Sequence, residues 1–343
     1  MLIIIKYLYQ KKLILVLLNI LILLIYPYIQ CINENTLNNN IDNIKYDIVI
    51  PVNLNDSKIL IQETDMLRKF LNYNNMIIIV PNNSELAKEK NNSLYYINEE
   101  ELVRKEDLIT IFNIRGINET KRINWYEQQF LKMSYSRICR NEYYLIWDSD
   151  TIPIKHINMF DDGHPIFDMK NEYHYPYFIT LERLLPHLSF SKMSYISEHM
   201  IIKTEFMNNL LDQIENNILI PGKFFWEKIL MSIDEKDILK SGFSEFETYG
   251  TYVDTKYPNI YKHRNWFSKR DMVKLFGKLD NLAQNDFIWL AKDYHALTFE
   301  KREKFEKKNI YFVKNKEIQK RYRPKRFFKY YKRVIKKYQN KKS

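Results

Sequence analysis

Short apolar segments that resemble buried strands alternate with segments of helical periodicity through the first half of the chain. The strand-like segments are residues 46–52, 76–80, 94–97, 109–114 and 143–147, and the helical ones are residues 59–71 and 125–139. This order predicts an α/β fold around a sheet that is at least partly parallel. Ligands of such sheets bind outside the carboxyl ends of the strands, so we expect the functional residues there.

One predicted strand leads directly into two carboxylates. The segment Tyr143–Trp147 is apolar and is followed by Asp148, Ser149 and Asp150. Carboxylates at i and i+2 are hard oxygen ligands that suit Mg²⁺ or Mn²⁺ when substrate phosphates complete the coordination. The alternative interpretation is an ordinary turn after a strand, where Asp and Ser are common. Rival phosphate loops are missing, because the sequence contains neither GxGxxG nor GxxxxGK[ST].

The two ends of the 343-residue chain differ in composition from its middle. We expect a hydrophobic signal anchor or signal peptide over residues 1–31, a polar linker over 32–44, a single folded domain over 45–300 and a basic tail over 301–343. Leu13–Ile25 is apolar apart from one asparagine and follows three lysines, which favours a single-pass membrane anchor. A cleaved signal peptide is the alternative, although no cleavage site with small residues is visible.

The positive charge of the chain is concentrated in the tail. The net charge is +11, and 11 of the 53 basic residues lie between Arg321 and Ser343, so the remaining 42 equal the 42 acidic residues. No nucleic-acid partner is therefore expected. The apolar residues of the tail recur at helical spacing among lysines and arginines: Phe327, Phe328, Tyr331, Val334, Ile335 and Tyr338. Such a helix binds an anionic membrane surface or docks on the domain, and both alternatives stay open.

The N-terminal anchor and the basic tail predict different sides of the membrane for the folded domain. Lysines before the first segment place the N-terminus in the cytoplasm and the domain on the opposite side of the membrane. A tail that binds anionic lipid prefers the cytoplasmic side. We therefore expect a membrane-associated protein whose side of the membrane stays open.

The Asp148–Asp150 segment resembles the DxD motif of glycosyltransferases with the GT-A fold. A longer pattern resembles an uncharacterised group of bacterial glycosyltransferase-like proteins, through Trp125–Gln129 with Lys132, Trp147–Pro153, Ser197–Met200 and Ser244–Gly250. The resemblance spans residues 45–300. It implies a GT-A-like, Rossmann-related mixed sheet flanked by helices, a nucleotide-sugar donor held at Asp148 and Asp150, and a divalent cation, Mn²⁺ or Mg²⁺.

Further polar residues are candidates for donor binding. Gln128 and Lys132 stand four residues apart on one helix face and suit a phosphate or ribose. Glu198 and His199 precede the strand-like segment Met200–Ile202 and suit a donor sugar or an acceptor. Each pair also has an ordinary structural interpretation, as an exposed helix face or as satisfied polar groups at the start of a strand.

Glu245 and Glu247 are the candidate catalytic residues. An inverting transferase needs one carboxylate to take the proton of the acceptor hydroxyl, and these two stand at i and i+2 in an aromatic stretch. The sequence does not choose between them, and a retaining enzyme needs no such base. GT-A proteins often bind the metal with one more histidine late in the chain, so the resemblance makes His263 and His295 candidates for that ligand.

The sequence thus predicts a metal-dependent glycosyltransferase. It would transfer a sugar from a nucleotide-diphosphate-sugar to a glycan, lipid-linked or other surface-polysaccharide acceptor, at a membrane surface that it meets through the N-terminal segment and the basic tail. Two other classes stay open: another metal-dependent phosphate enzyme, such as a nucleotidyltransferase or phosphohydrolase, and a non-catalytic membrane-surface protein. The segment Val52–Leu60 lacks the Gly-rich, basic loop that usually follows the first strand of a nucleotidyltransferase.

Overall fold

The computed structural model describes residues 44–52, 57–81, 84, 94–117, 120–300 and 303–339. The expected N-terminal anchor, and the linker up to residue 43, lie outside these residues. The chain divides into two compact units. The smaller unit contributes Ile44 and Phe160–His164 to the described residues, including strand β6 (Phe160–Asp161). The larger unit, Lys45–Met159 with Pro165–Ser343, holds the main sheet and the helices.

The main sheet has five strands in the order β3 (Leu94–Asn98), β2 (Met76–Val80), β1 (Tyr46–Pro51), β4 (Tyr143–Trp147) and β8 (His199–Lys203). The first four strands run parallel to their neighbours, and β8 runs antiparallel to β4. Strands β1, β2 and β4 are buried along their whole length, as expected for apolar strands with both faces covered. The predicted α/β fold with a partly parallel sheet is confirmed.

The chain order changes direction between β1 and β4. Strands β2 and β3 lie on one side of β1, whereas β4 and β8 lie on the other. Such a switch leaves a crevice outside the carboxyl ends of the two central strands, because the connections that follow them turn to opposite sides. Pro51 ends β1 and Trp147 ends β4, so the Asp148–Asp150 turn begins at this crevice.

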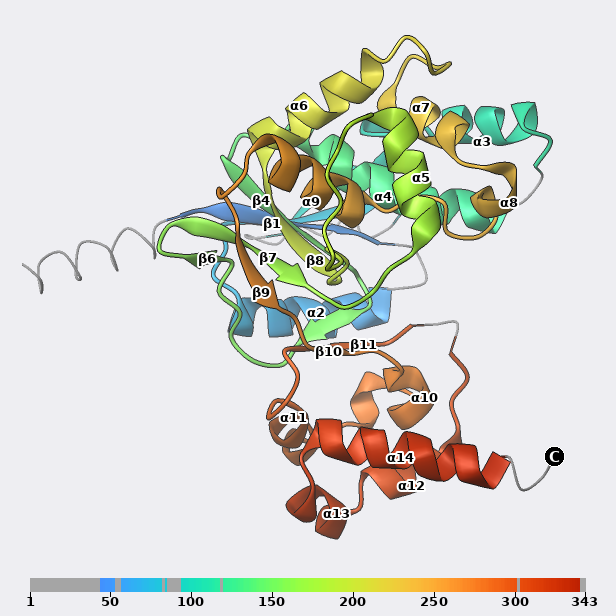
Figure 1. The fold of residues 1–343 in the computed structure, drawn as a ribbon. Helices are drawn as coiled ribbons and strands as arrows, with labels where there is room; N and C mark the ends of the chain where they lie inside the picture. The colour runs from blue at the N-terminus through green and yellow to red at the C-terminus, as the bar shows by residue number, and fades with distance from the viewer. Residues whose placement is uncertain are drawn as a thin grey trace, which may run out of the picture. The chain divides into compact units, whose positions relative to one another are not determined.

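Helices flank the main sheet. Figure 1 shows α2 (Ser57–Phe70) on one side of the sheet and α4, α6 and α9 on the other. The helices of the second side are α3 (Lys105–Ile114), α4 (Thr120–Ser134), α5 (Tyr175–Leu184), α6 (Thr204–Glu215), α7 (Phe225–Ser232), α8 (Glu235–Ile238) and α9 (Glu245–Lys256). Short 3-10 helices cover Glu99–Glu101, Tyr135–Arg137 and Leu279–Asn281.

The predicted strand at residues 109–114 is wrong, because this segment belongs to helix α3. Its sequence Ile-Thr-Ile-Phe-Asn-Ile suggests alternation, but the buried residues are Leu108, Ile111 and Phe112, which are spaced as on one face of a helix. Ile109 and Ile114 are exposed. The two exposed isoleucines therefore made this helical segment resemble a buried strand in the sequence.

Two small sheets adjoin the switch. Strand β7 (His164–Met169) pairs in parallel with β9 (Lys262–Asn265). Strand β11 (Ala296–Thr298) pairs with both β10 (Ser268–Lys269) and β5 (Thr151–Pro153). Because β5 follows Asp150 directly, the sheet with β11 ties the late part of the chain to the carboxylate turn.

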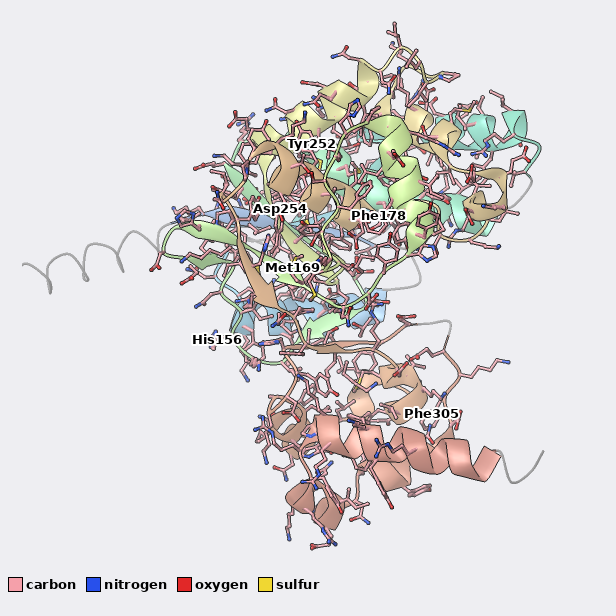
Figure 2. All side chains as sticks on the ribbon, in the orientation of Figure 1. His156, Met169, Phe178, Tyr252, Asp254 and Phe305 are labelled. Carbon is pink, nitrogen blue, oxygen red and sulfur yellow. The ribbon has the colours of Figure 1, made fainter. Side chains whose placement is uncertain are left out.

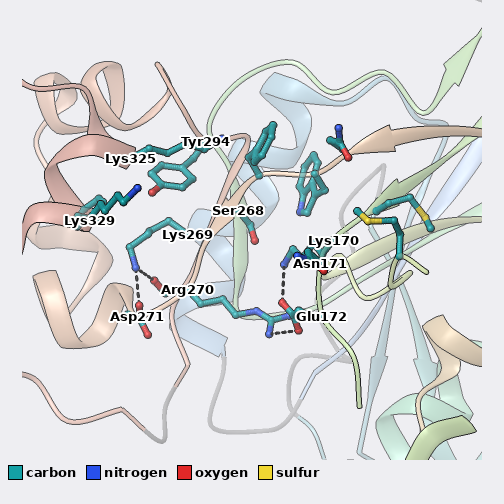
Figure 3. A pocket seen from close by; sticks show the side chains of 16 residues that line it. Lys170, Asn171, Glu172, Ser268, Lys269, Arg270, Asp271, Tyr294, Lys325 and Lys329 are labelled. Carbon is teal, nitrogen blue, oxygen red and sulfur yellow. Dashed lines mark hydrogen bonds and ion pairs between the residues drawn. The ribbon is translucent and has the colours of Figure 1, made fainter. Parts of the chain in front are cut away.

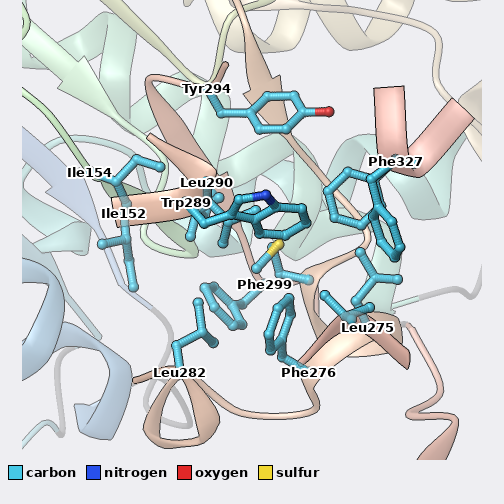
Figure 4. Packing of buried hydrophobic residues seen from close by; sticks show 14 of the residues in the cluster. Ile152, Ile154, Leu275, Phe276, Leu282, Trp289, Leu290, Tyr294, Phe299 and Phe327 are labelled. Atoms are coloured by element: carbon cyan, nitrogen blue, oxygen red, sulfur yellow. The ribbon is translucent and has the colours of Figure 1, made fainter. Parts of the chain in front are cut away.

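The C-terminal helices form a hydrophobic cluster with β5 (Figure 4). They are α10 (Met272–Phe276), α11 (Gln284–Leu290), α12 (Lys307–Val313), α13 (Lys316–Arg321) and α14 (Pro324–Gln339). Phe327 and Phe328 of α14 pack against Trp289, and Ile152 of β5 belongs to the same buried cluster. The described part of the apolar face of the tail is thus docked on the domain, which is the second of the two alternatives above. None of the helices among residues 44–339 that the structure describes has the length and apolar character needed to cross a membrane.

Candidate active site

Hydrogen bonds fix the turn that carries the two carboxylates. The amide of Asp148 donates to the carbonyl of Glu198 at 2.9 Å, and the amide of Thr151 donates to the carbonyl of Asp148 at 3.0 Å. The indole nitrogen of the buried Trp147 donates to the Thr151 carbonyl at 2.7 Å. These bonds hold Asp148 and Asp150 at the carboxyl end of β4.

The turn lines a cavity of about 450 Å³ at the switch between β1 and β4. Six of the residues proposed from the sequence line it, namely Gln128, Lys132, Asp148, Asp150, Glu198 and Glu245. The other lining residues are Pro51, Trp125, Gln129, Ser149, Tyr177, Ile196, Ser241, Ser244, Phe246, Arg270, Thr298 and Glu300. The cavity therefore gathers side chains from both central strand ends, from α4 and from the start of α9.

Lys132 is the central cation of this cavity. Its ammonium group, on the last turn of α4, donates to Asp148 Oδ1 and also to Glu245 Oε1 at 2.8 Å. The lysine and Glu245 are both buried. Burial alone would lower the pKa of Lys132, but the charges of Asp148 and Glu245 outweigh it and raise that pKa above its ordinary value. Lys132 therefore stays charged and links the DxD turn to α9.

Asp150 carries the least compensated negative charge of the turn. Burial raises the pKa of its carboxyl group to about 7, and repulsion from Asp148, Glu300 and Glu198 contributes in the same direction. Repulsion from these three carboxylates makes ionisation of Asp150 unfavourable unless a cation binds beside it. The local field thus favours a positive ligand beside Asp150.

Glu198 holds two cations at the rim of the cavity. Its carboxylate accepts hydrogen bonds from Lys170 and from Arg270 Nε, the latter at 2.6 Å, and from the indole of Trp266 at 3.0 Å. Burial would raise the Glu198 pKa, but Lys170 and Arg270 outweigh it and lower that pKa to about 2. The residue has a φ of 65°, in the left-handed region that non-glycine residues rarely adopt. A strained, fully ionised glutamate suits the positioning of cations better than proton transfer.

Glu245 begins α9 and points into the cavity. Ser244 is the N-cap of this helix, and its hydroxyl accepts from the amide of Glu247 at 3.3 Å. The Glu245 amide donates to the side chain of Gln129 at 3.2 Å, which fixes the helix start against α4. Burial raises the Glu245 pKa, with Lys132 opposing that shift and Asp148 adding to it. This carboxylate is thus buried, on the cavity wall and basic for its type.

Glu247 does not line the cavity, because it stands two positions after Glu245, whereas side chains three or four positions apart share a helix face. Its carboxylate accepts from the hydroxyl of Ser194, and Glu247 is not among the cavity-lining residues. Burial raises its pKa to about 7, although the Ser194 hydrogen bond opposes this. The spacing i, i+2 directs two helical side chains about 200° apart, so the geometry separates the two glutamates.

The three histidines proposed from the sequence also lie off the cavity wall. His199 Nε2 is 2.9 Å from Asp168 Oδ2, and its ring packs between Trp147 and Trp266. His263 Nε2 is 2.7 Å from Oδ2 of Asp254. Asp254 belongs to α9 and is labelled in Figure 2. His199 and His263 therefore hold elements together through buried or half-buried carboxylate contacts.

His295 packs in a stack of aromatic rings. Its ring centre is 4.8 Å from that of Trp266, with the planes nearly parallel. Burial lowers the His295 pKa to about 4, with the nearby Lys155 acting in the same direction. A neutral imidazole at physiological pH is the form that binds metals, but His295 is not among the residues that line the cavity.

Arg270, Thr298 and Glu300 belong to the cavity but have no signal in the sequence. Arg270 follows the two-residue strand β10, and Thr298 and Glu300 lie at the end of β11. The hydroxyls of Thr298 and Thr151 are 2.9 Å apart, and the Phe299 amide donates to the Asp150 carbonyl at 2.8 Å. Pairing of β11 with β5 brings Thr298 and Glu300 to the turn, and pairing of β10 with β11 brings Arg270 there. No local pattern reveals such pairings.

The residues at the turn fit a divalent cation whose coordination further ligands would have to complete. Asp148 and Asp150 supply hard oxygen donors, and the raised pKa of Asp150 marks negative charge that a cation would neutralise. Within the described ranges, however, no group of three or more His, Cys, Asp or Glu side chains is arranged to hold a metal ion. Phosphate oxygens and water would therefore have to complete the coordination, as is usual for Mg²⁺.

The chain belongs to the family of unknown function DUF6492, whose model matches residues 45–321. Among solved structures, the chain is similar to the galactosyltransferase LgtC in complex with donor and acceptor sugar analogues, with 9% identity over 80% of this chain and 94% of that one, at a TM-score of 0.38. It is also similar to mouse xyloside xylosyltransferase 1, with 11% identity over 75% of this chain and 98% of that one, at a TM-score of 0.37. No curated protein matches the sequence.

Proposed function

We propose that the chain is a glycosyltransferase of the GT-A type that transfers a sugar from a nucleotide-diphosphate-sugar to a hydroxyl of a glycan or lipid-linked acceptor. The proposed cofactor is Mn²⁺ or Mg²⁺, held by Asp148 and Asp150 together with the diphosphate of the donor. That cation would stabilise the negative charge that develops on the diphosphate leaving group.

One observation carries this proposal: Lys132 joins Asp148 to Glu245 inside the cavity at the strand switch. A carboxylate turn alone would suit many phosphate enzymes. Here the buried carboxylate of Glu245, on helix α9, contacts the same lysine that contacts the Asp148–Asp150 turn. An inverting transferase needs this pairing of functions, a place for the leaving diphosphate and a nearby base for the incoming hydroxyl.

Glu245 is the proposed general base. Its raised pKa makes the carboxylate a better proton acceptor than an exposed glutamate, while contact with Lys132 keeps it ionised. It would accept the proton of the acceptor hydroxyl as the bond to the sugar forms. Glu247 is left with a positioning role, since it contacts Ser194 outside the cavity.

Lys132 and Arg270 are the proposed cationic contacts of the donor diphosphate. Both line the cavity, and both are held by carboxylates, Lys132 by Asp148 and Glu245 and Arg270 by Glu198. Cations fixed in this way need no reorganisation when negative charge appears on the leaving group. Gln128 and the neighbouring Trp125 lie on the α4 side of the cavity and are placed to contact the nucleoside.

A donor-hydrolysis assay tests the proposal. The full chain is incubated with a panel of UDP- and GDP-sugars, with Mn²⁺ or with EDTA, and release of the nucleoside diphosphate is measured. We expect release that requires Mn²⁺ and that falls at least about a hundredfold in Asp150→Ala, as loss of a cation ligand predicts. Release that survives both EDTA and the substitution would reject the mechanism. Cleavage of nucleoside triphosphates or phosphomonoesters in place of nucleotide-sugars would instead indicate the competing class of phosphate enzyme.

A further inference from the structure

A second cavity of about 660 Å³ lies beside the first and shares Arg270 with it (Figure 3). Its walls come from the segment after β7, from the β9–β10 segment and from the first turns of α14. The lining residues are Met169, Lys170, Asn171, Glu172, Met193, Asn265, Trp266, Phe267, Ser268, Lys269, Arg270, Asp271, Tyr294, Lys325, Phe328 and Lys329. Apart from the shared Arg270, no residue that lines this second cavity has a role in the donor binding proposed above.

The second cavity is strongly cationic. Its wall carries five basic side chains, Lys170, Lys269, Arg270, Lys325 and Lys329, against two acidic ones, Glu172 and Asp271. The first three basic side chains already contact carboxylates, because Lys170 and Arg270 bind Glu198 and Lys269 binds Asp271. The two lysines of α14 therefore supply the excess positive charge.

Lys325 and Lys329 are one helical turn apart and face the same space in Figure 3. In the part of the chain that the structure describes, neither ammonium has a carboxylate within ion-pairing distance. Lys325 instead lies over the ring of Phe267. Burial, together with the positive charges of Lys155 and Arg323, lowers its pKa, with Asp293 opposing. Positive charges that crowd one another attract an anion from solution.

The wall of the second cavity also contains aromatic side chains. Trp266, Phe267, Tyr294 and Phe328 line the same cavity, and Phe267 is 42% exposed. Flat apolar surface beside fixed cations suits a ligand that joins a sugar or alkyl portion to a charged group. Neutral glycans would leave the lysines without a partner.

Arg270 places this ligand next to the donor. Its guanidinium donates to Glu198 at 2.6 Å, and the residue lines both cavities. A group bound to Lys325 and Lys329 would thus extend toward Arg270 and the donor cavity, where Glu245 lies on the wall.

We propose that the second cavity binds a phosphate or diphosphate group of the acceptor, with Lys325 and Lys329 of α14 as its principal contacts. The assignment of this ligand as the acceptor rests on the proposed glycosyl transfer. In this account the basic C-terminal segment forms a wall of the substrate site, and its charge selects an anionic acceptor.

A binding titration with inorganic pyrophosphate in EDTA tests the anion site apart from catalysis. The full chain is compared with Lys325→Gln/Lys329→Gln and with Arg326→Gln/Arg333→Gln, which removes the same charge from exposed positions of α14 outside the cavity. We expect the first variant to bind pyrophosphate at least about tenfold more weakly, since charge-assisted contacts are lost. The second variant should bind as the wild-type chain does. Lys325→Arg/Lys329→Arg should retain binding, because it keeps both positive charges, and retained binding of UDP with Mn²⁺ by the glutamine variant would exclude a folding defect as the cause.

Two results would overturn the site. One is an unchanged pyrophosphate affinity in Lys325→Gln/Lys329→Gln. The other is loss of that affinity in Lys132→Gln but not in the α14 variant, which would place the anion in the first cavity. Because this readout involves no sugar donor, pyrophosphate binding at α14 in a chain that hydrolyses no nucleotide-sugar would reject the proposed function and leave the anion site standing.

A transfer assay then identifies the source of the phosphate. Labelled sugar is offered with a soluble phosphorylated glycan in one arm, with vesicles that contain a polyprenyl phosphate in a second arm, and with an uncharged glycan in a third. Preferential labelling in either phosphate arm, weakened in Lys325→Gln/Lys329→Gln, supports the proposal and names the source. Equal labelling of the uncharged glycan by both chains contradicts it.

Discussion

Glu245 and Glu247 show how local geometry decides between two residues that the sequence leaves equivalent. Both glutamates are buried at the start of α9, and burial raises the pKa of each carboxyl group. Only Glu245 reaches the cavity and contacts Lys132, whereas Glu247 is occupied by Ser194. The two glutamates thus make different contacts although they stand only two positions apart.

Substitution of these glutamates by glutamine should separate their roles. Glu245→Gln removes the proposed base and should lower the rate of transfer by about 10²- to 10⁴-fold, with donor affinity changed only a few-fold. Glu247→Gln keeps an acceptor for the Ser194 hydroxyl and should retain most of the activity. Initial rates at saturating donor, with donor binding measured separately, check both. Equal losses in the two variants would argue against Glu245 as the base.

Asp150 should make the stability of the cation-free chain depend on pH. Its folded pKa of about 7 lies above the ordinary value of 3.8, so the folded state holds a proton that the unfolded state releases. The stability associated with this proton is present below about pH 4 and is lost as pH rises to about 7. Asp150→Asn, which mimics the neutral group, should therefore be more stable than the wild-type chain by an amount that grows over this range and then levels off.

Urea unfolding in EDTA between pH 4 and pH 8 measures this difference. The advantage of Asp150→Asn should reach about 4 kcal/mol at most by pH 8, since a pKa difference of one corresponds to about 1.4 kcal/mol. Saturating Mn²⁺ should reverse it, because the cation stabilises only a chain that retains the carboxylate. An advantage that does not change with pH would contradict the charge cluster around Asp150.

At the residue scale, local pattern predicts one half of the site and misses the other. Asp148 and Asp150 follow an apolar strand, and Lys132 falls on a regular helix, so their neighbourhood follows from short-range periodicity. Glu300 follows β11, which pairs with β5, and Arg270 follows β10, which pairs with β11, so both depend on pairing between segments far apart in the chain. Short-range patterns contain no information about such a pairing.

At the scale of elements, the structure adds most for α14, because it shows what covers the apolar face of this helix. Its helical spacing was predictable, but the spacing does not say whether lipid or protein covers the apolar face. Phe327 and Phe328 pack on Trp289, and Tyr331 bonds to Asn309 of α12. The misassigned strand at residues 109–114 has a similar origin, because exposed isoleucines imitate a buried pattern.

Removal of one aromatic side chain tests the docking of α14. Phe327 is 1% exposed, and Phe327→Ala should lower the free energy of unfolding by about 3 kcal/mol through lost burial and a cavity. Arg333→Ala on the exposed side of the same helix should change it by less than about 0.5 kcal/mol. Chemical denaturation of the full chain measures both. A stability unaffected by Phe327→Ala would show that the helix does not rest on the domain in solution.

At the scale of the whole molecule, the charge distribution agrees with the proposal that the basic segment binds an anionic substrate. The positive excess of +11 lies in residues 321–343, and two of its lysines line the second cavity. We propose that membrane attachment depends instead on the hydrophobic N-terminal segment, residues 1–31, which lies outside the described residues. Insertion of an apolar segment resists salt, whereas electrostatic adsorption is screened by it.

Extraction of membranes tests this division of roles. The full chain should stay in the membrane fraction after a wash with about 1 M salt, where electrostatic attachment is strongly screened. Neutralising Lys325 and Lys329 should not release it, and detergent should. Release by salt alone would indicate that the basic segment, and not the N-terminal segment, attaches the chain to the membrane.

The proposed mechanism requires that Asp148 and Asp150 bind a nucleoside diphosphate through a divalent cation. Calorimetric titration of the full chain with UDP and with GDP, in Mn²⁺ and in EDTA, measures this directly. The control is Asp212→Asn, which alters an exposed carboxylate paired with Arg137 on another surface. We predict binding of at least one nucleotide that requires Mn²⁺, is at least about a hundredfold weaker in Asp148→Asn/Asp150→Asn and is unchanged in the control. Binding of equal strength in EDTA and in the double variant, or no binding of either nucleotide, would contradict the account.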